Sequence, residues 1–172
     1  MNWDEYFYGI CVKVAENSKC LSRKIGAILV KDNIIISTGY SGPPRGVPSC
    51  KDRYLTDMNL NNKLSELYDE NTDFDPNVCP RRMLRFPSGE GMEWCVSIHA
   101  EKNCLLSAAR MGICTKGATL YSNMTITPCN QCFGALLNAG IKEVVCVDIN
   151  IYDVSVKWLM QNSDMVIRKF EI

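Results

Sequence analysis

The fold of this chain is decided between two short segments, Ser97-Ile98-His99-Ala100-Glu101 and Thr127-Pro128-Cys129-Asn130-Gln131-Cys132. Together they contain one imidazole and two thiols, the side chains that bind zinc through nitrogen and sulfur. A catalytic zinc has three protein ligands and keeps its fourth position for water, whereas a structural zinc is closed by a fourth ligand. His99, Cys129 and Cys132 therefore predict a zinc site with one open position.

Glu101 lies two residues after the histidine, and we expect it to transfer protons rather than bind the metal. Water bound to zinc loses a proton near neutral pH and becomes a usable nucleophile. A carboxylate beside that water can take the proton and pass it to a ring nitrogen, then to leaving ammonia. We therefore predict that Glu101 is the catalytic proton shuttle.

Both segments lie where helices are expected to begin. The residues that follow His99 read as a helix ending at Gly112, and Cys129–Ala139 reads as a helix ending at Gly140. Pro128 stands where helices often start. Two cysteines three residues apart share one face of the first turn, where the helix dipole favours thiolates. The metal is therefore expected between two helix starts.

Each half of the pattern has a simpler explanation when taken alone. A Cys-x-x-Cys pair can be a redox pair or half of a structural zinc site, and a single histidine is usually a packing residue. Here His99 is the only histidine of the chain, and both halves occur in order with a strand-like segment, Ala118–Ser122, between them. This context favours the catalytic interpretation.

Length and composition predict one soluble domain over residues 1–172. The chain is 47% hydrophobic and 22% charged, and its 19 basic and 19 acidic residues cancel, so nothing favours binding to long nucleic acid. There is no apolar run of membrane-spanning length, and Met1–Glu5 does not begin a signal peptide. We therefore expect a cytoplasmic protein, in which ten cysteines indicate metal binding rather than disulfides.

Strand and helix patterns alternate along the chain. Helices are expected at 3–19 and 153–161, and strands at 24–30, 34–39, 118–122, 142–148 and 165–170, the first two joined by a hairpin turn at 31–33. This alternation predicts an α/β layered domain. A cysteine-flanked insertion at about 50–95 interrupts it, with one or two helices over 54–69.

The insertion has few apolar residues of its own and is flanked by four cysteines, namely Cys20, Cys50, Cys79 and Cys95. A closed four-thiolate zinc would stabilise such a segment, and we predict one here. Cys20 and Cys50 are the more certain ligands. The alternative is that some of the four are small buried side chains. The remaining cysteines outside the catalytic motif are expected in the core: Cys11, Cys104, Cys114 and Cys146.

The chain resembles the bacterial and phage type of deoxycytidylate deaminase, within the cytidine deaminase-like superfamily, over nearly its whole length. A His-x-Glu followed by Pro-Cys-x-x-Cys is the known signature of zinc nucleobase deaminases. Further segments narrow the resemblance to the deaminases that act on nucleotides. These segments are Trp3–Phe7, Ser18–Cys20, Ile25–Ala27, Gly39–Gly42, Pro87–Gly89, Cys95–Glu101 and Asn138–Lys142.

This resemblance implies a three-layer α/β/α fold with a central five-stranded mixed sheet. It implies hydrolysis of dCMP to dUMP and ammonia, which supplies dUMP for thymidylate synthesis in pyrimidine nucleotide metabolism. It also implies a homo-hexamer that dCTP with Mg²⁺ activates and dTTP inhibits. A second zinc beside the allosteric region is a further implication.

Several residues are candidates for contact with substrate or effector. The resemblance points to a nucleotide-binding loop at Gly39, Tyr40 and Gly42, in which Ser41 replaces the family's asparagine and offers a different set of donors and acceptors. The backbone groups of Ala100 and Cys129 are expected near the base. Arg110 is a candidate phosphate ligand by charge, and Tyr152 is the candidate for stacking on the base.

The motif leaves other activities open. It does not report the number of phosphates, so dCTP, or both nucleotides, could be the substrate. A zinc-stabilised nucleotide sensor without turnover is a second alternative, although a binding module has no use for Glu101. RNA or DNA editing is a third, and the zero net charge argues against it.

Overall fold

The computed structural model describes residues 2–69 and 74–171. The chain divides into two compact units, described separately below. Unit 1 consists of Met1–Ser18, Ile25–Ser41 and His99–Ile172, and unit 2 of Lys19–Lys24 and Gly42–Ile98. Unit 2 includes the segment that the sequence analysis treats as an insertion. The organisation as a single domain stays a prediction.

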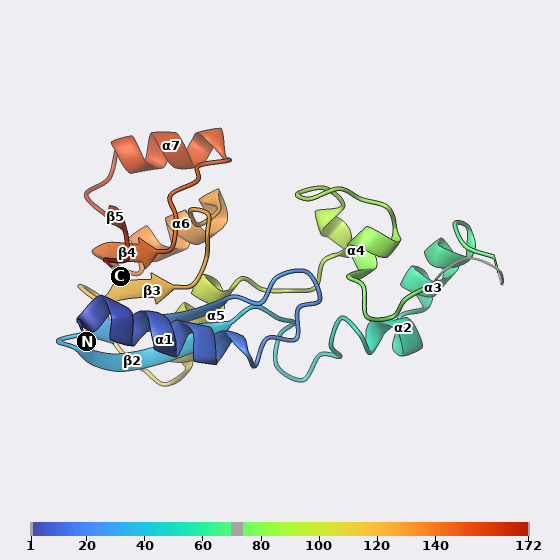
Figure 1. Ribbon diagram of the computed structural model, residues 1–172, viewed down its shortest axis with the longest axis horizontal. Coiled ribbons are helices and arrows are strands. Elements are labelled where there is room, and N and C mark those ends of the chain that lie inside the picture. The colour runs from blue at the N-terminus through green and yellow to red at the C-terminus, as the bar shows by residue number, and fades with distance from the viewer. Residues whose placement is uncertain (1, 70–73, 172) are drawn as a thin grey trace. The chain divides into compact units, whose positions relative to one another are not determined.

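Unit 1 is built on a mixed sheet in the order β2-β1-β3-β4-β5 (Figure 1). Its strands are β1 (Gly26–Lys31), β2 (Ile34–Tyr40), β3 (Thr119–Ser122), β4 (Glu143–Cys146) and β5 (Val166–Lys169). β1 runs antiparallel to β2 and β3, whereas β3, β4 and β5 are parallel. The predicted five-stranded mixed sheet is confirmed.

The hairpin between β1 and β2 follows from its turn residues. Asp32 and Asn33 have φ angles of 52° and 60°. Tight hairpin turns require positive φ at both central positions, and Asp and Asn tolerate it better than other residues with a side chain. The predicted hairpin turn at 31–33 is therefore confirmed.

Helices cover both faces of the sheet, as Figure 1 shows. They are α1 (Trp3–Ala15), α5 (Ala100–Arg110), α6 (Asn130–Asn138) and α7 (Val154–Gln161). Side chains of a strand alternate between faces. Ala27 and Leu29 belong to the core with α5, α6 and α7, whereas Ile28 and Val30 belong to the core with α1. The predicted three-layer α/β/α arrangement is confirmed for unit 1.

Unit 2 contains short helices around a small core. They are α2 (Arg53–Thr56), α3 (Met58–Ser65), α4 (Pro80–Met83) and the 3₁₀ helix η1 (Met92–Trp94). The expected helical region at 54–69 is thus two helices that meet at Asp57, whose carboxylate accepts a hydrogen bond from the N–H of Leu60. The core residues are Tyr54, Leu60, Leu64, Met83 and Leu84.

No helix in the part of the chain that the structure describes is both long enough and apolar enough to cross a membrane.

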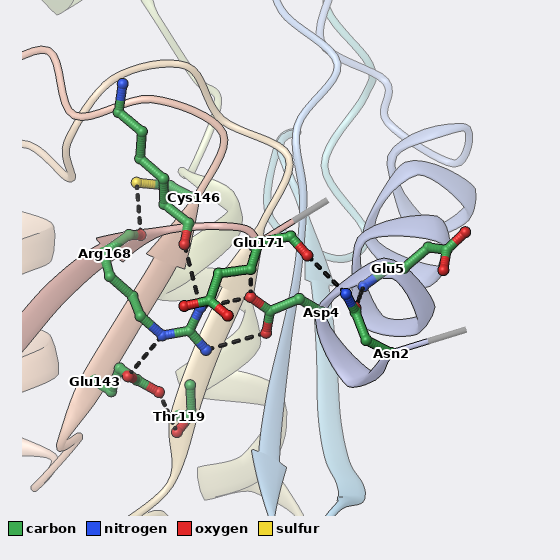
Figure 2. A network of polar contacts seen from close by, with 9 residues as sticks. Asn2, Asp4, Glu5, Thr119, Glu143, Cys146, Arg168 and Glu171 are labelled. Carbon is green, nitrogen blue, oxygen red and sulfur yellow. Dashed lines mark hydrogen bonds and ion pairs between the residues drawn. The ribbon is translucent and has the colours of Figure 1, made fainter.

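A charged network joins the first helix of unit 1 to its last strand (Figure 2). The guanidinium of Arg168 donates to both carboxylate oxygens of Asp4, at 2.5 and 3.0 Å, and to Glu143 at 2.9 Å. The N–H of Glu171 also donates to Asp4, at 2.9 Å. Asp4 is only 8% exposed, so these bonds replace most of its hydration. The network therefore holds α1 against the C-terminal strand.

We expect Asp4→Asn to lower the free energy of unfolding by about 1–2 kcal/mol at neutral pH, because one partner of a partly buried ion pair is lost. The Arg168 guanidinium holds the pKa of Asp4 below its usual value. The contribution of this carboxylate to the free energy of unfolding is therefore complete above its ordinary pKa. It is lost as pH falls through the lowered pKa of the folded protein. Urea unfolding between pH 7 and pH 3 measures both effects.

The matched control is Glu16→Gln, which removes the partner of Lys13 in an exposed pair and should change stability by less than about 0.5 kcal/mol. If Asp4→Asn were as stable as the Glu16→Gln variant at pH 7, the network would not stabilise the fold.

Candidate metal centre and active site

The three predicted zinc ligands of unit 1 lie at the starts of α5 and α6. His99 is the residue immediately before α5, and Cys129 is the residue immediately before α6. Cys132 lies in the first turn of α6. The prediction included Cys129 in the helix. The structure starts the helix at Asn130 and leaves Cys129 extended, with φ −64° and ψ 164°, so that its side chain can turn toward His99.

The spacing of these side chains suits a tetrahedral zinc. The Nδ1 atom of His99 lies 3.5 Å from the Cys129 sulfur and 3.4 Å from the Cys132 sulfur. All three ligand atoms are within 4.8 Å of one another. Tetrahedral Zn–N and Zn–S bonds of ordinary length place nitrogen and sulfur about 3.6 Å apart. The residues present therefore fit the metal that the sequence predicts.

The electrostatics of the site favour a thiolate at Cys129. Hydrogen bonds from the Cys132 thiol and from His99 lower the pKa of Cys129 to about 4. The bond to Cys129 also raises the pKa of His99. The same bond between the thiols raises the pKa of Cys132, so Cys129 loses its proton first. A thiolate is the form that binds metal.

Glu101 is almost completely enclosed, with 4% of its surface exposed. Burial raises the pKa of its carboxyl group. A carboxyl whose pKa is raised toward neutrality is suited to both accept and donate a proton. The Cys132 thiol lies close enough to bond to it, so the carboxyl is held beside the three candidate ligands.

Gly39 lies so close to α5 that a side chain there has no room. A Cβ atom would lie 2.2 Å from the Cys104 nitrogen and 2.6 Å from the Ala100 carbonyl oxygen, both backbone atoms of α5. α5 also carries Glu101, so Gly39 fixes the distance of the catalytic helix from β2. Gly39 thus has a packing role, and its predicted contact with a nucleotide stays a prediction.

Gly39→Ala should therefore lower the free energy of unfolding by more than about 2 kcal/mol, because backbone atoms of α5 have to move. Thermal unfolding followed by circular dichroism measures it. The matched control is Gly134→Ala in α6, where a Cβ meets nothing within 4 Å. That substitution should keep or raise stability by about 0.5–1 kcal/mol. Equal melting temperatures for the two variants would contradict the close approach.

The hydroxyl of Ser41 is used inside unit 1. It lies 2.8 Å from the Ser18 hydroxyl and accepts a hydrogen bond from the Ile25 N–H at 3.1 Å. Ser41 is only 5% exposed. In unit 2, Gly42 forms an antiparallel bridge with Ile98. The predicted roles of both residues in nucleotide binding stay predictions.

Two exposed aromatic side chains have different surroundings. Tyr40 is 40% exposed, and its carbonyl oxygen accepts a bond from the Asn103 side chain at 2.8 Å. Tyr152 is 59% exposed. Partial burial, followed by the charge of the Cys129 thiolate, raises the pKa of Tyr152 to about 12. The Cys129 thiolate therefore acts electrostatically on Tyr152, whose role in stacking on the base stays a prediction.

Ala100 and Arg110 lie at opposite ends of α5. Ala100 is buried beside His99, next to the candidate metal site. Arg110 is in the last turn, which ten residues of helix place about 15 Å along the axis. The structure therefore does not bring Arg110 to the metal centre of its own chain, and its role as a phosphate ligand stays a prediction.

In unit 2 the thiols of Cys20, Cys79 and Cys95 act electrostatically on Cys50. Among the described residues, only His99, Cys129 and Cys132 have ligand atoms gathered closely enough for a metal, so the four-cysteine site stays a prediction. Burial, followed by the neighbouring thiols of Cys20, Cys79 and Cys95, raises the pKa of Cys50 to about 11. All four have free thiols. Mutually repelling thiolates are the arrangement that a divalent metal relieves.

The prediction that Cys114 lies in the core is wrong. Its side chain is exposed, whereas Cys11, Cys104 and Cys146 are buried as expected. The reason is local: Cys114 lies in the loop after α5, between Gly112 and Gly117, which both have positive φ angles.

Sequence reasoning did not identify the role of Asp153. The prediction includes it as the first residue of a helix, but it precedes α7 and caps it, accepting a hydrogen bond from the Ser155 N–H. An Asp followed two residues later by Ser, just before an apolar helical pattern, is the signal that would have indicated a cap.

Comparison with known proteins agrees with this geometry. Residues 1–148 match the family model described as the cytidine and deoxycytidylate deaminase zinc-binding region. The chain is 34% identical over 149 residues to the deoxycytidylate deaminase of Mycobacterium phage D29, an alignment that covers 84% of this chain and 93% of that protein. It is 37% identical over 146 residues to the deoxycytidylate deaminase of Enterobacteria phage T4, covering 79% and 72%.

Among solved structures, the dCMP deaminase of cyanophage S-TIM5, in complex with dCMP and dUMP, has the same fold. The TM-score is 0.61 at 22% sequence identity, over 96% of this chain and 94% of that chain. The family model and the phage relatives confirm the resemblance inferred from the motifs. The chain belongs to the cytidine and deoxycytidylate deaminase family.

Proposed function

We propose that the protein is a zinc-dependent hydrolase that converts dCMP to dUMP and ammonia. The observation that carries the proposal is the convergence of His99, Cys129 and Cys132 within 4.8 Å of one another, beside the buried carboxyl of Glu101. Phage relatives with up to 37% identity are deoxycytidylate deaminases.

In this proposal His99, Cys129 and Cys132 hold the catalytic zinc. Zinc with one open position lowers the pKa of a bound water and so supplies the nucleophile for attack at C4 of cytosine. Glu101 accepts the proton that the attacking water loses and donates it to the ring nitrogen N3. It then accepts the proton of the new C4 hydroxyl and donates it to the departing amino group, which leaves as ammonia. Its raised pKa supports both directions of transfer.

The proposed contacts of the base come from the same region of unit 1. Tyr152 supplies an aromatic face within range of the metal ligands, and the backbone at Ala100 and Cys129 borders the base. Stacking on an aromatic side chain and hydrogen bonds to the Watson–Crick edge are how deaminases select a pyrimidine. Gly39, Tyr40, Ser41 and Gly42 remain proposed contacts on the basis of family resemblance.

We further propose a structural zinc in unit 2, held by Cys20, Cys50, Cys79 and Cys95. Two findings support it: the Cys50 thiol interacts with the other three thiols, and unit 2 has a small apolar core. Four thiolates make a closed site with no position for water, so this metal would contribute stability and no chemistry.

Regulation and assembly are proposed from the resemblance alone. They comprise activation by dCTP with Mg²⁺, inhibition by dTTP, a homo-hexamer and a cytoplasmic location. Sedimentation of the purified protein with and without dCTP tests the assembly. A monomer under both conditions would remove the hexamer from the proposal.

The experiment that tests the function is ammonia release from dCMP, dCTP and deoxycytidine, each measured with and without dCTP or dTTP and Mg²⁺. We expect turnover of dCMP. Ammonia release from dCTP, and not from dCMP, would identify the triphosphate as the substrate, which is the first alternative. Nucleotide binding without ammonia from any substrate would support the non-catalytic sensor.

A further inference from the structure

The start of α6 has an unusual cap. The residue before a helix normally uses a Ser, Thr, Asp or Asn side chain to accept hydrogen bonds from the first free N–H groups. Cys129 occupies this position, and it offers only a sulfur, a weak acceptor that faces the N–H of Cys132. This sulfur also lies beside the His99 ring. The N–H of Asn130, the first residue of α6, finds its acceptor elsewhere in the chain.

Asp153 supplies that acceptor. Its Oδ2 atom accepts from the N–H of Asn130, the first residue of α6, at 3.4 Å. Its Oδ1 atom accepts from the Ser155 N–H at 3.0 Å and from the Ser155 hydroxyl at 2.5 Å, which caps α7. The Asn130 side chain also donates to the Ser155 hydroxyl, at 3.3 Å. One carboxylate thus caps two helices and joins their starts.

Hydrogen bonds also join the loop before α6 to the loop before α7. The N–H of Val147 donates to the Met124 carbonyl at 2.9 Å, and the N–H of Thr127 donates to the Asn150 carbonyl at 3.1 Å. The side chain of Asn150 returns a bond to the Thr125 carbonyl at 3.0 Å. The loop that follows β4 is therefore paired along its length with the loop that leads into the metal site. Asp153 closes the pairing at the end nearest Cys129.

Tyr152 is the residue before Asp153 in the chain. Partial burial, and after it the charge of the Cys129 thiolate, raises the pKa of its phenol. The side chain of Tyr152 is 59% exposed. What fixes the backbone of this residue is the bonding of Asp153 on one side and of Asn150 on the other.

We propose that Asp153 is a positioning residue for the deaminase reaction. It holds the start of α6, which carries Cys132, and the loop that carries Tyr152 in one arrangement. Asp153 acts through these elements and contacts neither the substrate nor the reacting atoms. The inference rests on the proposed function, because Tyr152 is taken as the side chain that stacks on the pyrimidine.

Three variants test this role. Asp153→Ala removes both caps. Asp153→Asn keeps one acceptor oxygen and should restore part of the loss. Asp164→Ala, the matched control, removes an exposed carboxylate beyond the other end of α7. We expect Asp153→Ala to raise KM for dCMP about tenfold and to release zinc to a chromogenic chelator about tenfold faster, as the loss of a supporting contact near a metal does.

A double-mutant cycle with Tyr152→Ala separates positioning from general destabilisation. If Asp153 acts through Tyr152, Asp153→Ala should raise KM for dCMP in the wild-type background and have little further effect once Tyr152 is alanine. An equal increase in KM in both backgrounds would overturn the proposal. Zinc release at the same rate as from the Asp164→Ala control would also overturn it. Zinc release does not depend on the substrate, so it tests the contact to α6 even if dCMP proves not to be turned over.

Discussion

Glu101→Gln should abolish ammonia release from dCMP, with kcat lower by at least about a thousandfold, while the protein retains its zinc. Glutamine has the shape of glutamate but cannot accept and return a proton at neutral pH. A positioned acid–base group contributes about 10²–10⁴ in rate, and this single group is proposed to serve two successive transfers. Turnover in a coupled ammonia assay and zinc content by elemental analysis measure the two quantities.

The charge of Glu101 is buried, so its replacement by a neutral side chain should not destabilise the fold. A lower melting temperature together with lost zinc would mean that the activity was lost through the metal site. Glu16→Gln, an exposed change on α1, is the control and should leave turnover unchanged. Activity of Glu101→Gln within tenfold of wild type would remove the proton-shuttle role.

The elements of unit 1 could be predicted from sequence because their patterns are local. Alternation in Gly26–Lys31 places successive side chains on opposite faces, and the structure assigns them to two different cores. The turn at Asp32 and Asn33 needs only the positive φ that these residues tolerate. The three zinc ligands were predicted for the same reason: each half of the motif lies within one helix start.

Contacts between distant residues could not be predicted in this way. Asp4 and Arg168 are 164 positions apart, and nothing in either segment indicates the other. The packing of Gly39 against the backbone of α5 could not be predicted either, because the two segments are far apart in the sequence. The bond from Asn130 to Asp153 depends on α6 and α7 starting side by side, which only the assembled sheet determines.

The second metal site has the other large expected effect. Cys50→Ala should lower zinc from about two ions per chain to about one, because a four-thiolate site that loses one ligand binds the metal far more weakly. Unit 2 should then become sensitive to proteolysis between residues 42 and 98. Its apolar core is small, and a folding unit of roughly 60 residues is marginal without a metal or disulfide.

Cys50 is well suited to this test because its thiol is buried and interacts with all three other proposed ligands. Cys114→Ser, at the exposed cysteine, is the matched control and should leave zinc content and proteolysis unchanged. If Cys50→Ala is insoluble, stepwise removal of zinc from the wild-type protein by a chelator distinguishes the sites, since only one ion should be linked to protease resistance of unit 2. Two zinc ions per chain in Cys50→Ala, or one in the wild type, would contradict a four-cysteine site.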